Sequence, residues 1–464
     1  MHCAQRSLPP LAMRRSNSSS LLKRALRLRS VDTRLGRLLF PGLVLFGAAY
    51  VTFIFCDALA QAAQLSQHRA GEPDFGAFTP LVLDFADAAA RTQPLSELTS
   101  RASVPAVPTI HVMATSNGSP YLNWQTRTMY KTFQMVQATP EGAHMKYFTR
   151  LLHRRTDDEL VAEVPTLRVD SLHAACDTWC EFPVADRPHA VAAWLKTEDA
   201  QLGDYLFLIE TDYVWLAPVP APLAPGDKPL AFHYHYINPG YPGLESVISR
   251  MWPGGQQSLI PCTGPAPVLI THGDLVRLMP KWEEYAAWIE NDSEAKDKLG
   301  WVREMYAYSI AAAQAGIVHE VQEPGSTVLI SQPPADDSAG RASLFHYTWG
   351  AQFKNSSGGV VWEFDKRPFT ETRHVRTMRA YIPSLPPQDA ATRGLRLQDG
   401  KPVTEALLKV ETQMLSRMRA AIEQLPDLNV ACGWNGEPVC QWGCTQGVLC
   451  LPTGRTFKVE GDAR

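Results

Sequence analysis

Three catalytic signatures are missing from this chain of 464 residues. It contains no G-x-x-x-x-G-K-S/T phosphate loop, no G-x-G-x-x-G dinucleotide fingerprint and no G-x-S-x-G nucleophile elbow. The chain therefore lacks the marks of a P-loop protein and of a Rossmann dinucleotide-binding protein. Nothing in it marks a Ser-His-Asp hydrolase either.

Net positive charge is confined to the N-terminus. The formal net charge is −3, and residues 1–37 contribute +8 through nine Lys and Arg against one acid, so residues 38–464 carry −11. A mildly acidic body of this kind offers no basic surface to a nucleic acid. We therefore expect no nucleic-acid partner.

Charge is absent altogether from residues 38–56, an apolar run of 19 residues. Such a run is just long enough to cross a bilayer as a helix. Because basic residues precede it and Asp57 follows it, the positive-inside rule predicts a cytosolic N-terminus and a lumenal chain beyond residue 57. A cleaved signal peptide and an organellar transit peptide are the alternatives. The long basic leader and the lack of a clean small-x-small site favour a retained anchor.

Composition divides the chain into six parts. We predict a cytosolic basic tail (1–37), a transmembrane signal anchor (38–56), a stem rich in Ala, Gln, Ser and Pro (57–105), a main folded domain (106–385), a linker with an amphipathic helix (386–428) and a cysteine-rich tail (429–464). Seven of the nine cysteines follow the anchor, where an oxidising lumen would favour disulfides.

A cluster of four cysteines closes the chain, at Cys432, Cys440, Cys444 and Cys450. Its spacing is not that of two C-x2-C pairs, so two disulfides are a better interpretation than a zinc site. The sequence leaves three connectivities open for them. In the same compartment, the sequons at Asn291 and Asn355 would be glycosylation acceptors.

Segments with strand and helix patterns alternate along the chain. Apolar or alternating runs predict strands at residues 109–115, 167–169, 205–209, 230–237, 267–270, 318–322 and 327–330. Helical spacing of apolar residues predicts helices at residues 121–137, 188–195, 274–289, 296–315 and 404–424. This alternation predicts an α/β domain with a mostly parallel sheet.

Two carboxylates follow the predicted strand at residues 205–209. This strand is an unbroken apolar run, as expected of a strand buried on both faces of a sheet. Glu210 and Asp212 therefore lie where the chain leaves the sheet, at the edge where α/β proteins bind ligands. Carboxylates spaced i, i+2 can bind one hard cation that also holds substrate phosphates. A solvated turn is the alternative interpretation of this acid-x-acid motif on its own.

Thr115 and Glu304 are candidates for the same site. Thr115 ends the first predicted strand, where a strand-to-turn step often contacts a nucleotide, although a plain strand and loop would look the same. Glu304 shares a predicted helix face with aromatic residues, where burial would tune its pKa. A salt bridge to Arg303 or Lys298 is the alternative for Glu304.

Three basic side chains are further candidates, and Arg127, Lys146, Arg150 and Arg187 are other basic ones. An imidazole at a strand end, such as that of His346, can supply a third metal ligand, whereas a lone histidine is more often a core residue. Lys366 and Arg367 are adjacent cations that would suit a diphosphate through charge-assisted hydrogen bonds. A surface salt-bridge turn is the alternative for this pair.

Eight short motifs occur in order between about residues 108 and 385. They are H-V-M-A-T at 111–115, W-Q-T-R-T-M-Y at 124–130, M-K-Y-F-T-R-L-L-H at 145–153, R-P at 187–188, E-T-D at 210–212, G-W-V-R-E-M-Y-A-Y at 300–308, H-Y-T-W-G at 346–350 and F-D-K-R-P-F at 364–369. In order and rough spacing they closely resemble the hydroxyproline O-arabinosyltransferase family of plants and green algae. The peptidyl-serine α-galactosyltransferases of green algae share parts of this pattern.

The resemblance implies a GT-A-like glycosyltransferase domain in a single-pass type II membrane protein of the Golgi or ER, with a lumenal catalytic domain. It also implies a reaction: transfer of L-arabinofuranose from UDP-arabinofuranose to hydroxyproline in a secreted peptide or cell-wall glycoprotein. A divalent cation, usually Mn²⁺, would assist, and the anomeric configuration would be retained.

The resemblance also implies roles for individual residues. Asp212 would hold the metal, with Glu210 beside it touching the metal or the ribose, and His346 would be a third ligand. Lys366 and Arg367 would hold the departing diphosphate. Glu304 would orient the acceptor or the donor sugar, and Thr115 would lie at the nucleotide.

The chain also departs from the family pattern. Plant members commonly have Pro and His where this chain has Thr211 and Tyr213, although both acids are kept. The Cys176 and Cys180 pair and the C-terminal cysteine cluster are not part of the plant pattern. Two alternatives therefore stay open: a peptidyl-serine O-galactosyltransferase of the same fold, and an inactive, membrane-anchored protein that binds carbohydrate or peptide.

Overall fold

The computed structural model describes residues 107–172, 182–221, 228–348 and 350–428, together with strands β14 (Val448–Cys450) and β15 (Thr456–Lys458). The predicted basic tail, membrane anchor and stem lie outside the described residues, as do the pair of Cys176 and Cys180 and most of the cysteine-rich tail. Within the described part of the chain, no helix combines the length and the apolarity needed to cross a membrane. Cys262, which is described, is disulfide-bonded.

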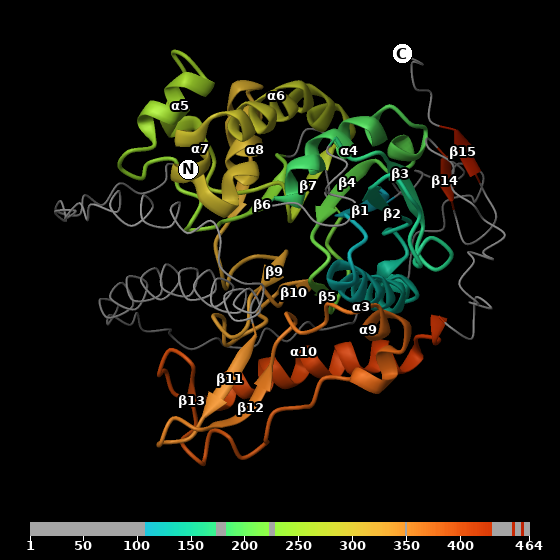
Figure 1. Ribbon diagram of the computed structural model, residues 1–464, viewed down its shortest axis with the longest axis vertical. Helices are drawn as coiled ribbons and strands as arrows, with labels where there is room; N and C mark the ends of the chain where they lie inside the picture. Colours follow the sequence, from blue (N-terminus) through green and yellow to red (C-terminus); the bar gives the residue numbers. More distant parts are fainter. Residues whose placement is uncertain are drawn as a thin grey trace, which may run out of the picture. The chain divides into compact units, whose positions relative to one another are not determined.

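A nine-stranded sheet crosses the domain in the order β15-β14-β3-β2-β1-β4-β7-β6-β8 (Figure 1). Its central strands run parallel to one another: β3 (Thr166–Val169), β2 (Tyr147–His153), β1 (Ile110–Ser116) and β4 (Tyr205–Ile209). Every residue of β1 and β4 is buried, as predicted for strands covered on both faces. The central strands thus confirm the predicted α/β domain with a mostly parallel sheet.

Antiparallel strands extend the sheet on both sides. β7 (Val268–Thr271) pairs with β4, and β6 (Leu230–Phe232) pairs with β7 in antiparallel and with β8 (Glu320–Gln322) in parallel orientation. At the other edge, β14 pairs antiparallel with β3 and β15. The strand predicted at residues 230–237 ends early because the chain turns after β6, where the amide of Ile237 donates to the carbonyl of Tyr234.

Helices pack on the main sheet from two sides. In Figure 1, α4 (Arg187–Leu195), α6 (His272–Asn291) and α8 (Arg303–Gln314) lie on one side of the strands, and α3 (Pro120–Gln137) lies on the other. Pro188 stands at the start of α4, where its fixed φ suits the first turn of a helix. The predicted helices at 121–137, 188–195 and 274–289 are confirmed.

The helix predicted over residues 296–315 is divided in the structure, so that prediction is wrong. α7 (Ser293–Leu299) ends at Gly300, whose φ of +57° lies in the left-handed region that other residues rarely adopt. α8 begins three residues later, at Arg303. α5 (Glu245–Met251) joins α7 through Arg250, which contacts Glu294 at 2.8 Å.

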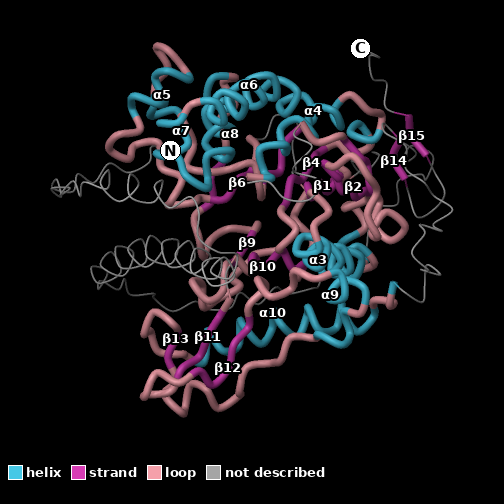
Figure 2. The backbone as a smooth tube through the Cα atoms, viewed as in Figure 1, coloured by secondary structure: helices cyan, strands magenta, loops and turns pink. Residues whose placement is uncertain are grey.

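Two small sheets and two helices lie on the α3 side of the main sheet (Figure 2). Their elements are β5 (Tyr213–Trp215), β10 (Leu344–His346), β9 (Ile330–Ser331), β12 (Val360–Phe364), β11 (Ala351–Lys354), β13 (Arg396–Leu397), α9 (Thr372–Arg376) and α10 (Glu405–Gln424). The first three strands form one sheet, in the order β5-β10-β9. This sheet is the one that completes the functional site.

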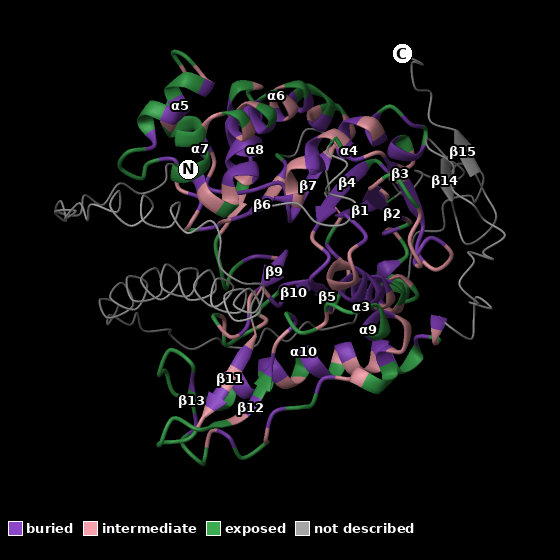
Figure 3. Ribbon diagram, viewed as in Figure 1, coloured by how far each residue is buried: buried purple, intermediate pink, exposed green. Residues whose placement is uncertain are grey.

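The amphipathic helix α10 packs its apolar face against α3 and β5. Every residue predicted for this face is buried, namely Leu407, Val410, Met414, Met418 and Ala421. Figure 3 shows buried stretches alternating with exposed ones along α10. Thr404 caps the helix, because its hydroxyl accepts a hydrogen bond from the amide of Leu407 at 3.1 Å. The methionines therefore belong to the core, as predicted, but Glu411 is buried on the same helix and has no counterpart in the predicted pattern.

Candidate active site

The carboxyl ends of β1 and β4 bring Thr115 and Glu210 to one edge of the sheet. Ala114 of β1 lies opposite Ile209 of β4, so the two candidates are the next residues along neighbouring strands. Arg187 joins them. Its Nε donates to Thr115 Oγ1 at 3.1 Å, and its Nη2 donates to Glu210 Oε2 at 2.8 Å. Two predicted residues therefore meet through Arg187, which the sequence had named only as one further basic candidate.

Arg187 also holds Glu304, which arrives from α8. Arg187 Nη1 donates to Glu304 Oε2 at 3.1 Å, so the guanidinium contacts two carboxylates and one hydroxyl. Burial acts to lower the pKa of Arg187, but Glu210 and Glu304 outweigh burial and raise it above its ordinary value. The side chain therefore remains a fixed cation between two acids.

Glu304 titrates near neutral pH in this environment. Only 3% of its surface is exposed, and burial raises the pKa of Glu304 to about 7. Arg187 opposes this rise, Glu210 adds to it, and Trp282 opposes it by donating from Nε1 to Glu304 Oε1 at 3.1 Å. A carboxyl group with this pKa can hold or release a proton at physiological pH.

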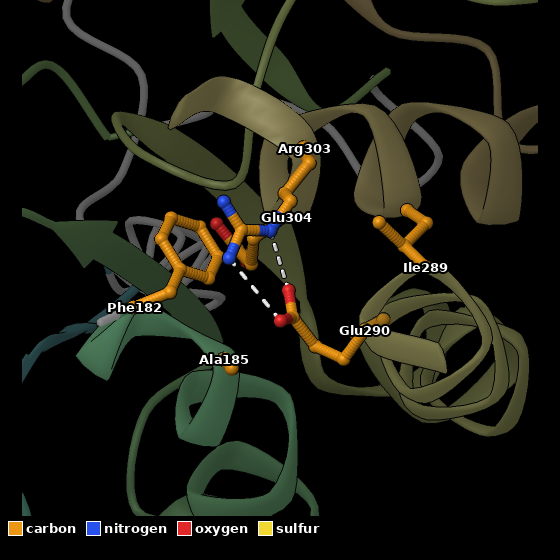
Figure 4. A pocket seen from close by; sticks show the side chains of 7 residues that line it. Phe182, Ala185, Ile289, Glu290, Arg303 and Glu304 are labelled. Atoms are coloured by element: carbon orange, nitrogen blue, oxygen red, sulfur yellow. Dashed lines mark hydrogen bonds and ion pairs between the residues drawn. The ribbon is translucent and has the colours of Figure 1, made fainter. Parts of the chain in front are cut away.

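Both predicted alternative partners of Glu304 are engaged elsewhere, and Lys298 contacts Glu294 at 2.8 Å. Figure 4 shows Arg303 directed at Glu290, to which its Nε and Nη2 donate at 2.5 and 3.1 Å. The guanidinium also lies 3.4 Å from the ring centroid of Phe182. These side chains line a small pocket on one side of Glu304, with Ala185, Ala286 and Ile289. Glu304 is therefore paired with Arg187 and not with its neighbour in sequence.

Asp212 forms a second ionic cluster, with His346 and Lys366. It precedes β5, which pairs antiparallel with β10 so that Tyr213 lies opposite His346. Asp212 Oδ2 lies 3.3 Å from His346 Nε2 and accepts a hydrogen bond from Lys366 Nζ. The amide of Tyr347 donates to the carbonyl of Asp212 at 3.3 Å and fixes this turn. The pairing of β5 with β10 thus unites residues that are far apart in sequence.

Asp212 stays ionised. Burial acts to raise the pKa of Asp212, but Lys366 and His346 outweigh burial and hold that pKa well below its usual range. Lys366 responds in the opposite sense, since burial acts to lower the pKa of its ammonium and Asp212 raises it. The pair is therefore ionised on both sides over the physiological pH range.

Gln332 orients the imidazole of His346. Its Nε2 lies 3.1 Å from His346 Nδ1 and 3.2 Å from Thr348 Oγ1. Because Gln332 contacts Nδ1, Nε2 is the ring nitrogen that faces Asp212. The ring of Tyr213 packs against the imidazole with centroids 4.8 Å apart. Together these contacts fix the direction in which His346 points.

The turn after β12 places Lys366 in the site and Arg367 outside it. Phe369 stacks on Trp124 of α3, with ring centroids 4.0 Å apart, and holds the turn against the domain. At Gly350, an added Cβ would lie 2.2 Å from the carbonyl oxygen of Phe364, so glycine is required where β12 ends. Arg367 is 74% exposed at its side chain and contacts Asp365 at 2.7 Å. The two adjacent cations are thus separated.

The donor groups present fit a divalent cation in part. Asp212 and His346 offer a carboxylate and an imidazole in contact, and such a cation commonly completes its shell with water and substrate phosphates. Glu210 is instead bound to Arg187 at 2.7 Å. Among the residues that the structure describes, no group of three or more His, Cys, Asp or Glu side chains could hold a metal ion. The three-ligand set therefore remains a prediction.

The sequence placed Arg187 only among the further basic candidates, and it pointed to neither Gln332 nor Trp282. The R-P dipeptide at 187–188 marks a helix start, and this is the one signal that could have singled out Arg187. Gln332 and Trp282 carry no local signal, because their function here is a contact with His346 or Glu304 made across the fold.

Comparison with known proteins agrees with the resemblance carried by the eight sequence motifs. A family model described as the hydroxyproline O-arabinosyltransferase family N-terminal domain matches residues 110–321. Hydroxyproline O-arabinosyltransferase 3 of Arabidopsis thaliana is 34% identical over 284 residues, which cover 60% of this chain and 76% of that protein. Hydroxyproline O-arabinosyltransferase PLENTY of Lotus japonicus is 31% identical over 308 residues, 65% of this chain and 80% of that protein.

More distant proteins match as well. The peptidyl serine alpha-galactosyltransferase of Arabidopsis thaliana is 26% identical over 230 residues, 46% of this chain and 27% of that protein. A solved glycosyltransferase involved in glycosylation of the major capsid of PBCV-1 is 12% identical, covers 52% of this chain and 93% of its own, and has a TM-score of 0.28, too low to assign a fold. On the closer matches, this chain belongs to the hydroxyproline O-arabinosyltransferase family.

Proposed function

We propose that this chain transfers L-arabinofuranose from UDP-arabinofuranose to the hydroxyl group of hydroxyproline in secreted or cell-wall proteins. The observation that carries the proposal is a pair of ionic clusters built on the residues that follow β4: Asp212 with His346 and Lys366, and Glu210 with Arg187 and Glu304. Family membership supports the same activity.

The first cluster suits the leaving group. Cleavage of the bond between C1 of the sugar and the diphosphate places negative charge on UDP, and fixed cations stabilise such charge. Lys366 supplies a charge-assisted hydrogen bond to a diphosphate oxygen. A divalent cation, for which we expect Mn²⁺, would be held by Asp212 and His346 and would supply Lewis-acid stabilisation of the same oxygens.

The second cluster suits the sugars. Carboxylates such as Glu210 and Glu304 accept hydrogen bonds from sugar or hydroxyproline hydroxyls and so orient them. We infer that the acceptor oxygen bonds to C1 on the face from which UDP departs, while its proton passes to the departing diphosphate. This course retains the anomeric configuration and requires no enzyme nucleophile. Arg187 is then a positioning residue for both acids.

Transfer to serine is the alternative reaction. It is favoured by the match to a peptidyl serine alpha-galactosyltransferase and by the Cys176 and Cys180 pair and the C-terminal cysteine cluster, which are not part of the plant pattern.

For the cellular site we propose a Golgi or ER membrane, with residues 38–56 as a type II anchor and the catalytic domain in the lumen.

A transfer assay tests the proposal. The lumenal portion from about residue 58 is supplied with Mn²⁺ and with UDP-arabinofuranose or UDP-galactose, each offered to a hydroxyproline peptide, its proline version and a serine peptide. We expect arabinose on the hydroxyproline peptide alone. Galactose on serine would support the alternative reaction, and a folded protein that transfers neither sugar would contradict both.

Replacement of the central arginine should change the pH dependence of the reaction. Arg187 lowers the pKa of Glu304, so Arg187→Met should raise that pKa above about 7 and move the acidic limb of kcat/KM to higher pH. We expect a loss of about 10²-fold at pH 7, with partial rescue in Arg187→Lys. The pH profile of kcat/KM checks this, and an unmoved acidic limb would show that Glu304 does not control it.

A further inference from the structure

We propose that Lys366 occupies the place of the metal at Asp212 in the enzyme without substrate, and that it moves to the donor's diphosphate when a divalent cation binds. This inference rests on the proposed function and deepens it, because it couples the binding of the cation to the binding of the nucleotide. It gives Lys366 control of the metal site as well as a contact with the leaving group.

The contacts of Asp212 converge on a single oxygen. Oδ2 accepts a hydrogen bond from Lys366 Nζ and lies 3.3 Å from His346 Nε2. A divalent cation binds a carboxylate oxygen through the same lone pairs. Because the ammonium and the cation are both positive, they repel each other strongly at one oxygen. Binding of a cation there therefore requires that Lys366 leave.

Burial decides where Lys366 can go. Its side chain is only 10% exposed and that of Asp212 only 12%, so the ammonium is largely out of water. A buried charge without a counter-ion is strongly unfavourable. A diphosphate bound beside the cation provides a new counter-ion within reach of the long, flexible lysine stem. The backbone can stay in place, since the stacking of Phe369 on Trp124 holds the turn.

The neighbouring cations are not equivalent to Lys366. Arg187 contacts Glu210 and Glu304, so two carboxylates hold it in place. Arg367 is 74% exposed and contacts Asp365. Of these three cations, Lys366 is the one that contacts Asp212 and can exchange one anionic partner for another.

The exchange makes a thermodynamic prediction. Without UDP, a cation must displace the ammonium from Asp212 and leave it without a counter-ion, so the cation binds weakly. With UDP present, the diphosphate accepts the ammonium, so the two ligands strengthen each other's binding reciprocally. Part of that coupling passes through Lys366 and should disappear when its charge is removed.

Binding of Mn²⁺ to the purified full chain tests this directly. Paramagnetic resonance of unbound Mn²⁺ gives its affinity with and without UDP, and no transfer is needed. In the unchanged chain, we expect UDP to tighten Mn²⁺ binding about tenfold or more. In Lys366→Met, Mn²⁺ should bind about tenfold more tightly without UDP, and the gain from adding UDP should shrink to the part that comes from direct contact of the diphosphate with the cation.

Matched variants isolate the charge at this position. Lys366→Arg keeps a cation and should retain weak Mn²⁺ binding without UDP. Arg373→Met removes one positive charge from an exposed side chain that contacts Glu371, and it should leave both Mn²⁺ affinities unchanged. Asp212→Asn should abolish Mn²⁺ binding in either condition. A tightening in Lys366→Met but not in Arg373→Met would assign the effect to the contact with Asp212.

Two results would overturn the inference. If Lys366→Met binds Mn²⁺ alone no more tightly than the unchanged chain, Lys366 does not compete for Asp212; transfer by the unchanged chain would then leave the proposed function standing. If Asp212→Asn binds Mn²⁺ as the unchanged chain does, the cation lies elsewhere. Failure of the unchanged chain to bind Mn²⁺ even with UDP would overturn the metal-dependent function and this inference together.

Discussion

Asp212→Asn is expected to lower arabinosyl transfer by about 10³-fold, which corresponds to about 4 kcal/mol of lost transition-state stabilisation. The amide keeps the shape of the side chain but removes the charge that faces His346 and Lys366. Measurement of kcat/KM with UDP-arabinofuranose and a hydroxyproline peptide checks this. A variant within tenfold of the unchanged chain would place the essential acid elsewhere.

The same substitution should destabilise the protein, because it leaves the buried ammonium of Lys366 without a counter-ion. Breaking a buried ion pair in this way costs about 3 to 5 kcal/mol. The double variant Asp212→Asn with Lys366→Met should recover most of that stability and none of the activity. Asp389→Asn, which alters a 62% exposed acid, is the control and should change neither quantity. A double variant no more stable than Asp212→Asn would show that the two charges do not stabilise each other in the folded chain.

Local pattern was enough to predict the elements that carry the site. The unbroken apolar run at 205–209 coincides with β4, and the helix expected at 121–137 differs from α3 by one residue. Such elements follow from periodicity and from their end signals, which are properties of neighbouring residues. For the same reason the helix at 296–315 was predicted wrongly. The helical pattern of residues continues through Gly300, but the backbone conformation of Gly300 interrupts the helix.

Partners across the site could not be predicted, because adjacent residues on a helix point about 100° apart. Arg303 is the sequence neighbour of Glu304, yet it contacts Glu290 and Phe182. Glu304 contacts Arg187 instead, 117 residues away. That pairing depends on the packing of α4 near α6 and α8, a tertiary arrangement to which no local pattern points.

The contacts of Asp212 have the same origin. His346 reaches it through the antiparallel register of β5 and β10, and a shift of one residue would turn the imidazole to the other face of that sheet. Lys366 and Arg367 looked equivalent as a pair of cations for a diphosphate. The structure separates them because Asp365 binds Arg367 at the surface, while the turn after β12 directs Lys366 inward.

Glu411→Met is expected to stabilise the protein at neutral pH. Glu411 is fully buried on α10, neither of its carboxylate oxygens has a hydrogen-bond partner among the described residues, and burial raises the pKa of Glu411 to about 8. The folded chain therefore keeps a proton that the unfolded chain releases near pH 4.5. The contribution of Glu411 to stability is thus greatest below pH 4.5, falls as pH rises toward 8, and is about 2.5 kcal/mol lower at pH 7 than at pH 5.

Methionine removes that titration and fills a similar volume with apolar atoms, as Met414 and Met418 do on the same helix face. Denaturant unfolding should therefore show that the gain in free energy of unfolding from Glu411→Met is about 2.5 kcal/mol larger at pH 7 than at pH 5. Glu423→Met, at an exposed position of α10, should show no such growth. A pH-independent difference for Glu411→Met would mean that its carboxyl ionises in the folded chain as readily as in the unfolded one, which requires a counter-charge or water beside α10 to offset its burial.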